Sequence, residues 1–196
     1  MFEHLRVDFA RVVAVEDGSG LRRALIALSA PGFHAVAVYR FGRWALGLPA
    51  WLRWPLSLAY YVLYFFVRAL WGIEVPRKAA IGPGLYIGHF GGVHVSGRAV
   101  IGANCAMSQG ITIGMTGDGA DSGIPVIGDD VYIAPGARIF GRIRVGNNVK
   151  IGPNACVHRD VPDNAVLVLD PGYRILSYNG NRPVSLAERR RSSSTG

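Results

Sequence analysis

The sequence is poor in cysteine, with only Cys105 and Cys156 among 196 residues. Two cysteines cannot build the multi-bridge framework that stabilises small secreted domains. Both fall inside a repeat described below, where a small buried thiol can pack as an alanine does. We therefore expect two buried structural thiols, a reducing cytoplasmic environment and no cysteine nucleophile.

Long hydrophobic runs are scarce as well. An uncharged apolar stretch at residues 54–67, between Arg53 and Arg68, has 14 residues, whereas a spanning helix needs about 20. The first residues, MFEHLRVDFARV, lack the basic start and apolar run of a secretory signal. For 54–67 we predict a helix, and three roles stay open: packing within an oligomer, contact with the cytoplasmic face of a membrane, or a true span.

Charge of one sign is not concentrated in any part of the chain. The net charge is +8, and the excess is spread: residues 1–76 carry eight Lys/Arg against five Asp/Glu, 77–176 nine against seven, and 177–196 four against one. Without a basic stripe we expect no nucleic-acid partner. The moderate basicity suits a phosphate-rich cofactor or an anionic membrane surface.

Glycine, in contrast, is abundant, with 26 residues spread mainly over the second half of the chain. There, aliphatic residues recur with a period of six, and several are followed by glycine. The repeat positions are Val75, Ile81, Ile87, Val95, Ile101, Met107, Ile113, Ile127, Ile133, Ile139, Val145, Ile151 and Val157. No 3.6-residue period appears over 77–165, which argues against a helical structure there.

A period of six predicts a triangular coil in which three hexads make one circuit. Each hexad is a short strand and a turn, and its aliphatic residue points inward onto its equivalents in the neighbouring coils. Glycine and asparagine permit the positive φ that the corners need. We predict three segments: an N-terminal helical segment over 1–74, a β-helix over 75–176, and a basic, disordered tail over 177–196.

The register slips twice. The spacing from Ile87 to Val95 is eight, which places two extra residues in GHFGGVH. The spacing from Ile113 to Ile127 is fourteen, which we interpret as two hexads plus two residues. Insertions leave the coil on one face and often build a binding surface, so His89 and His94 in the first slip are candidate site residues.

The β-helix resembles the serine acetyltransferase family and the related sugar O-acetyltransferases of polysaccharide pathways. The resemblance covers residues 81–176 through IGPGLYIGHFGG, MSQGITIG, IGDDVYIAPGARIFG, VGNNVKIGPNACV and VPDNA. It implies a mainly β protein, a left-handed parallel β-helix preceded by an N-terminal α-helical segment. It also implies a homotrimer that transfers an acetyl group from acetyl-CoA to a hydroxyl.

In that family the histidine of the first slip is the general base, which carried over is His89, with His94 as a candidate assistant. An imidazole can accept the hydroxyl proton as the oxygen attacks the thioester. The resemblance also implies that acetyl-CoA lies in a groove between neighbouring β-helices, and no metal is expected. The residues expected to contact acetyl-CoA are Gly114, Met115, Pro135, Lys150, Pro153 and Arg174.

Two departures from the family concern the acceptor. The family has an Asp directly before the catalytic histidine, where this chain has Gly88. It also has an Arg-His pair that contacts the amino acid, where this chain has Gly123 and Ile124. Because a site built on hydrogen bonds discriminates strongly, we predict a sugar hydroxyl of surface or exopolysaccharide biosynthesis as the acceptor, with serine as the alternative.

Two other classes remain as alternatives. The spacing of His89 and His94 is similar to that of the paired zinc ligands in β-helix carbonic anhydrases, although catalytic zinc usually takes three protein ligands. The chain could also be a β-helix scaffold without activity, because the Asp before His89 is absent.

Overall fold

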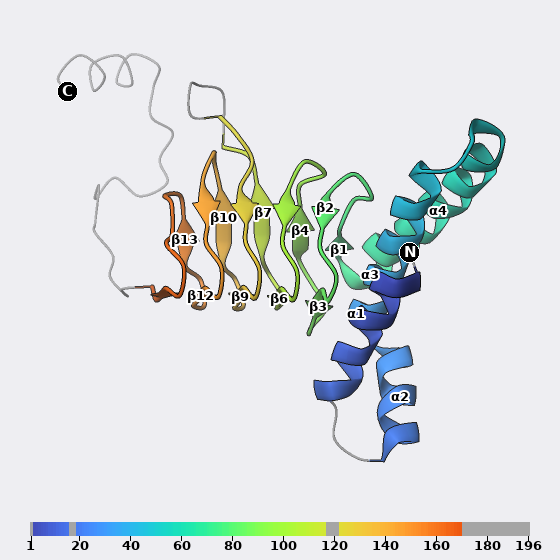
Figure 1. Ribbon diagram of the computed structural model, residues 1–196, viewed down its shortest axis with the longest axis horizontal. Coiled ribbons are helices and arrows are strands. Elements are labelled where there is room, and N and C mark those ends of the chain that lie inside the picture. The colour runs from blue at the N-terminus through green and yellow to red at the C-terminus, as the bar shows by residue number, and fades with distance from the viewer. Residues whose placement is uncertain (1, 16–18, 117–121, 170–196) are drawn as a thin grey trace, which may run out of the picture.

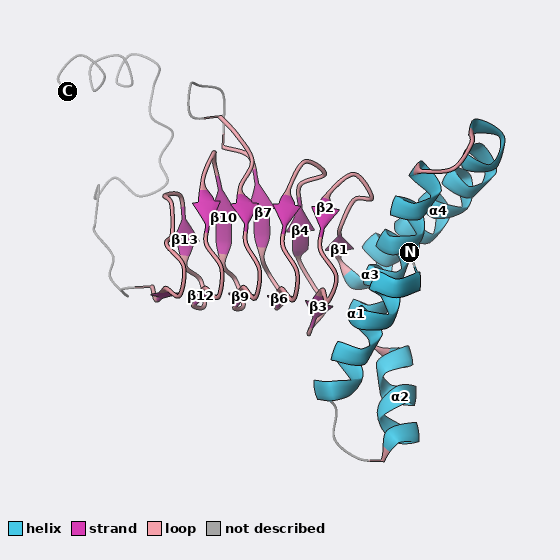
Figure 2. Ribbon diagram, viewed as in Figure 1, coloured by secondary structure: helices cyan, strands magenta, loops and turns pink. Residues whose placement is uncertain are grey.

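The computed structural model describes residues 2–15, 19–116 and 122–169. In these residues four helices precede a stack of short parallel strands, and the helices gather at one end of that stack (Figures 1 and 2). The helices are α1 (Phe2–Val15), α2 (Gly20–Ser29), α3 (Pro31–Leu46) and α4 (Ala50–Trp71).

The strands form three parallel sheets, which we call sheets A, B and C in the order in which the chain enters them. Sheet A contains β1 (Ile73–Glu74), β4 (Val93–Val95), β7 (Thr112–Gly114), β10 (Arg138–Phe140) and β13 (Cys156–Val157). Sheet B contains β2 (Ala80–Ile81), β5 (Val100–Ile101), β8 (Val126–Ile127) and β11 (Arg144–Val145). Sheet C contains β3 (Tyr86–Ile87), β6 (Ala106–Met107), β9 (Tyr132–Ile133), β12 (Lys150–Ile151) and β14 (Val166–Leu167).

Each coil takes one strand from each sheet, and the repeat residues stack along the inside. Ile139, for example, pairs with Ile113 in the coil before it and with Val157 in the coil after it, and all three are buried. Several corners have a left-handed backbone at asparagine or aspartate, residues that tolerate it: Asn104, Asp130, Asn148, Asn154 and Asn164. The predicted left-handed parallel β-helix with a preceding helical segment is confirmed.

The structure corrects the interpretation of the second slip. Strands β7 and β8 are consecutive in the chain and lie in adjacent sheets, A and B. The step from Ile113 to Ile127 is therefore a single hexad with eight inserted residues, not two hexads plus two. A period alone cannot distinguish these cases, because both restore the same register afterwards.

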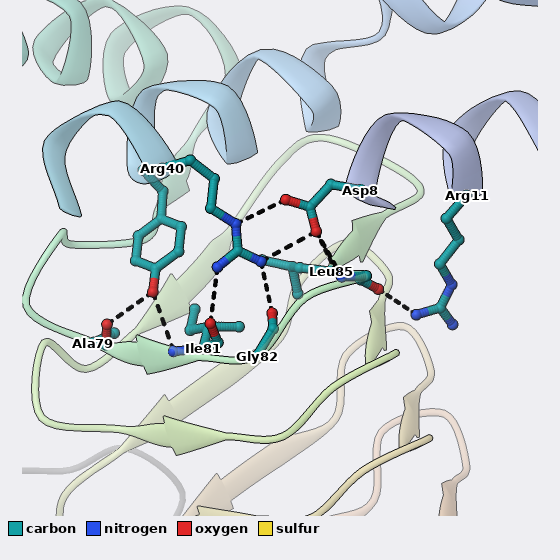
Figure 3. A network of polar contacts seen from close by, with 9 residues as sticks. Asp8, Arg11, Arg40, Ala79, Ile81, Gly82 and Leu85 are labelled. Atoms are coloured by element: carbon teal, nitrogen blue, oxygen red, sulfur yellow. Dashed lines mark hydrogen bonds and ion pairs between the residues drawn. The ribbon is translucent and has the colours of Figure 1, made fainter. Parts of the chain in front are cut away.

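Helices α1 and α3 are joined to the first coil by a buried polar network (Figure 3). The Arg40 guanidinium donates to both carboxylate oxygens of Asp8, with its Nε 2.7 Å from Oδ2, and to the carbonyl oxygens of Ile81 and Gly82. Asp8 Oδ1 also accepts hydrogen bonds from the backbone N–H groups of Gly84 and Leu85 at 2.7 and 2.8 Å. The network therefore satisfies strand and turn groups that the first coil would otherwise leave unpaired.

Helix α4 ends at Trp71, and the capping residue Gly72 has a φ of 61°, the left-handed conformation of a helix C-cap. Within the described residues, no single helix has the length and apolar character needed to cross a membrane. The bent pair α2 and α3, which meet at 69°, satisfies both criteria together.

Candidate functional site

The loop that carries His89 connects β3 in sheet C with β4 in sheet A, so it lies at a corner of the coil. Gly91 donates a hydrogen bond to the carbonyl of Trp71 at 2.8 Å and accepts one from Gly110 at 2.8 Å. Gly91 and Gly92 have φ values of 99° and 69°, which side chains rarely adopt. The loop is thus fixed between α4 and the next coil.

His89 is exposed on this loop, and no described residue hydrogen-bonds to its imidazole. Its neighbour Phe90 is also exposed, at 60%. An accessible imidazole that no neighbouring group engages is free to approach a hydroxyl, as a general base must.

The second histidine of the slip belongs to a charged cluster beside the loop. His94 Nδ1 lies 3.2 Å from Glu74 Oε2, and Arg68 Nε lies 3.8 Å from the same oxygen. These three side chains and Phe65 line an open pocket of about 510 Å³ that also includes Gly92 of the loop. We call it the corner pocket, and it presents a cation, a carboxylate and an imidazole side by side.

Gly88, Gly123 and Ile124 stand where the family has Asp, Arg and His, and the structure shows what surrounds each of them. A Cβ on Gly88 would lie 3.1 Å from the Tyr86 ring, so that ring covers the position. A Cβ on Gly123 would lie 2.5 Å from Cβ of Arg142. Ile124 is half-buried and packs against the hydrophobic core. None of these three positions offers a polar side chain to an acceptor.

A second pocket lies on sheet C, on the outside of the last coils. It has a volume of about 520 Å³ and is lined by Tyr132, Ala134, Pro135, Lys150, Gly152 and Pro153. The Lys150 ammonium stands 5.8 Å from the centre of the Tyr132 ring. This largely apolar groove with one cation at its side can hold an extended apolar chain with a phosphate near the lysine; we call it the sheet C groove.

The six residues expected to contact acetyl-CoA are only partly brought together. Pro135, Lys150 and Pro153 line the sheet C groove, whereas Gly114 and Met115 lie at the end of β7 in sheet A. Met115 is 53% exposed. Arg174 lies outside the described residues.

The two cysteines differ from each other. Cys105 is fully buried, and burial raises the pKa of its thiol from 9.0 to about 11. Cys156 is exposed, so the expectation of two buried thiols is wrong for Cys156. In the described part of the chain, no three His, Cys, Asp or Glu side chains gather to hold a metal, which leaves the zinc alternative without a third ligand there.

Sequence reasoning missed Glu74 and Tyr132. Glu74 is the only acidic residue between positions 18 and 117, and that isolation was an available signal. Tyr132 directly precedes a repeat residue, where the strand alternation directs a side chain outward.

Comparisons with known proteins find relatives that match most of this chain, and these relatives are serine acetyltransferases. Residues 124–159 match the family of bacterial transferase hexapeptide repeats (six repeats). A serine acetyltransferase of Synechococcus elongatus is 32% identical over 182 residues, which cover 93% of this chain and 71% of that protein. A serine acetyltransferase of Mycobacterium tuberculosis is 35% identical over 142 residues, covering 72% of this chain and 59% of that protein.

Solved structures of serine acetyltransferases are also similar to this chain. The crystal structure of Neisseria gonorrhoeae serine acetyltransferase in complex with serine has a TM-score of 0.70 and 29% identity, covering 88% of this chain and 68% of that one. This chain is thus shorter than the proteins it matches. These similarities also correct the predicted acceptor. The related proteins and the similar solved structures are serine acetyltransferases, which overturns the prediction of a sugar in polysaccharide biosynthesis. That prediction rested on Gly88, Gly123 and Ile124, and the absence of polar groups at three positions does not exclude others nearby.

Proposed function

This chain belongs to the serine acetyltransferase family, and we propose that it transfers the acetyl group of acetyl-CoA to the hydroxyl of L-serine. The observation that carries the proposal is the 32% identity to the Synechococcus elongatus enzyme, which spans 93% of this chain and so includes both the helices and the β-helix. Family membership confirms the predicted enzyme class, an O-acetyltransferase with acetyl-CoA as co-substrate.

In the proposed mechanism His89 is the general base. Its imidazole accepts the proton of the serine hydroxyl while that oxygen attacks the thioester carbonyl. The tetrahedral intermediate then collapses, the C–S bond breaks, and the thiolate of coenzyme A takes the proton from the His89 imidazolium, which restores the neutral base. The exposure of His89 and its fixed loop support this role. No acyl-enzyme is needed, because the serine oxygen attacks the thioester directly.

We assign the acceptor to the corner pocket. Serine carries a carboxylate and an ammonium at neutral pH, and the pocket offers Arg68 to the first and Glu74 to the second. His94, held against Glu74 at 3.2 Å, is an orienting group beside them. These residues would take over the binding role that Gly88, Gly123 and Ile124 cannot perform.

We assign acetyl-CoA to the sheet C groove, with Pro135 and Pro153 against the pantetheine arm and Lys150 near a phosphate. Gly114 and Met115 lie on a different sheet. Both groups can contact one cofactor if a neighbouring subunit supplies one of them, so we propose a homotrimer with donor sites between subunits.

The test is thiol release from acetyl-CoA with L-serine as the acceptor. We expect release well above hydrolysis, and His89→Ala should lower kcat by about 10²–10⁴-fold, the usual effect of removing a general base. The control is His158→Ala, which changes an exposed histidine after β13 and should leave the rate unchanged. No serine-dependent release from folded protein would refute the proposal, and an unaffected His89→Ala would refute the assignment of the base.

A further inference from the structure

Helix α4 contacts the rest of the protein through one side, along a buried stripe. Tyr60 and Val67 on this stripe are buried, and the Tyr60 hydroxyl accepts a hydrogen bond from the Arg77 N–H at 3.0 Å. Beside the stripe, the Ser57 and Tyr61 hydroxyls accept hydrogen bonds from the Arg77 guanidinium at 2.9 and 3.5 Å. The opposite side of the helix faces outward.

The outward side of α4 is lined with large apolar side chains. Each is between 50% and 77% exposed. At 3.6 residues per turn they fall opposite the buried stripe and follow the full length of the helix. They are Trp51, Trp54, Leu58, Val62, Phe65 and Phe66, and we call this surface the α4 apolar face.

The charges of α4 have one sign only. The helix contains Arg53 near its start and Arg68 near its end, and no aspartate or glutamate. Arg68 has a carboxylate within reach, that of Glu74 at 3.8 Å. Arg53 is exposed and has no ion-pair partner among the described residues.

We propose that the α4 apolar face docks on an anionic phospholipid bilayer, with the helix lying in the plane of the interface. An apolar stripe with tryptophans and phenylalanines, accompanied by arginines, is the composition of helices that insert one face into the headgroup boundary. Tryptophan favours that depth because its ring is amphipathic, and each arginine near an anionic surface adds attraction.

A second copy of the chain is the competing occupant of this surface. Arg53 lies seven residues before Tyr60, on the side of the buried stripe, so two packed α4 apolar faces would leave it without a carboxylate from α4. The headgroup layer of an anionic bilayer supplies negative charge near such an arginine.

The proposed homotrimer would strengthen the membrane contact. Cyclic symmetry places the helical segments of all three subunits at the same end of the assembly. If the α4 apolar faces point along the symmetry axis, all three can engage one bilayer at the same time, which raises the overall affinity. The proposal does not depend on the identity of the acceptor, although Phe65 and Arg68 also line the corner pocket, and it requires that α4 be accessible.

The experiment is flotation of the full chain with vesicles of phosphatidylcholine alone or mixed with phosphatidylglycerol. We expect binding to the mixed vesicles and about tenfold weaker binding to phosphatidylcholine. Trp51→Ser/Trp54→Ser should weaken binding to the mixed vesicles by at least about tenfold. Arg53→Glu should reduce the difference between the two lipids.

The matched control is Val100→Ser/Val126→Ser, which removes two exposed aliphatic side chains from the β-helix and should bind as the parent does. Circular dichroism establishes that each variant is folded. The proposal is overturned if the parent fails to float with mixed vesicles, or if Trp51→Ser/Trp54→Ser floats equally well. It is also overturned if that variant lowers the assembly mass in light scattering while the parent binds no lipid, because the face is then a contact between copies.

Discussion

Neighbouring positions of one hexad have opposite environments. The repeat residue and the residue two positions before it point inward, as Met107 and Cys105 do. The residue directly before the repeat residue points outward, as Cys156 does before Val157. Glu74 and His94 on sheet A, and Tyr132 and Lys150 on sheet C, all stand at this outward position of the hexad. The β-helix residues that line both proposed pockets with polar or aromatic side chains therefore share one position of the repeat, and α4 adds Phe65 and Arg68 to the corner pocket.

The burial of Cys105 predicts an unusually inert thiol. Its pKa of about 11, against an ordinary 9.0, keeps it protonated over the range in which a free cysteine ionises. Because only the thiolate reacts, alkylation by iodoacetamide at pH 8 should be about 100-fold slower than for a free thiol. The rate should rise with pH until about 11.

The measurement uses Cys156→Ser, so that Cys105 is the only thiol, and mass spectrometry follows the modified fraction. The same variant in denaturant provides the reference rate. Rapid alkylation of the folded variant at pH 8 would contradict the buried position of Cys105.

At the level of secondary structure, the β-helix was predictable and the packing of the helices on it was not. A six-residue period is local, so Ile81, Ile101 and their equivalents could be read directly from the sequence. The step from Ile113 to Ile127 was misread because an insertion of eight residues leaves the later register unchanged. The contact between Asp8 and Arg40 joins residues 32 positions apart, and no periodic signal links them.

The buried pair therefore predicts a large effect on the docking of α1 and α3. Asp8→Ala should lower the free energy of unfolding by about 3–5 kcal/mol, because it leaves the Arg40 guanidinium buried without its carboxylate. It also leaves two backbone N–H groups, those of Gly84 and Leu85, without their acceptor. Asp8→Asn should fall between the parent and Asp8→Ala, since the amide oxygen can still accept.

Urea denaturation followed by circular dichroism measures these differences. Glu3→Ala is the control, because Glu3 lies on the same helix but is exposed, and it should change stability by less than about 0.5 kcal/mol. An Asp8→Ala variant within that same margin of the parent would mean that the network contributes little to the attachment of the helices.

In the whole molecule, the three sheets form three separate faces of the β-helix, so outward residues of different sheets cannot line the same groove within one subunit. The sheet C groove carries Lys150 and Pro153, whereas Met115 emerges from sheet A. A long cofactor that needs both surfaces must lie between two β-helices packed side by side. Parallel packing of three such prisms around one axis supplies three equivalent grooves, which is the arrangement that we propose.

The last prediction follows from this arrangement. Light scattering on the full chain should give three times the 21.1 kDa of one subunit, or a multiple of that trimer if the helical ends also associate.

Acetyl-CoA binding, measured by calorimetry, should weaken about tenfold in Lys150→Ala, because a charge-assisted contact with a phosphate is lost. Arg144→Ala is the control: Arg144 is an exposed cation at the outward position of sheet B, which is not part of the proposed groove, and its removal should leave the affinity within about twofold of the parent. If light scattering shows the parent chain to be a monomer and calorimetry shows that this monomer binds acetyl-CoA, the groove between subunits would be refuted, since one subunit would then be sufficient. A trimer in which Lys150→Ala binds normally would leave the assembly intact as a proposal, but it would remove acetyl-CoA from the sheet C groove.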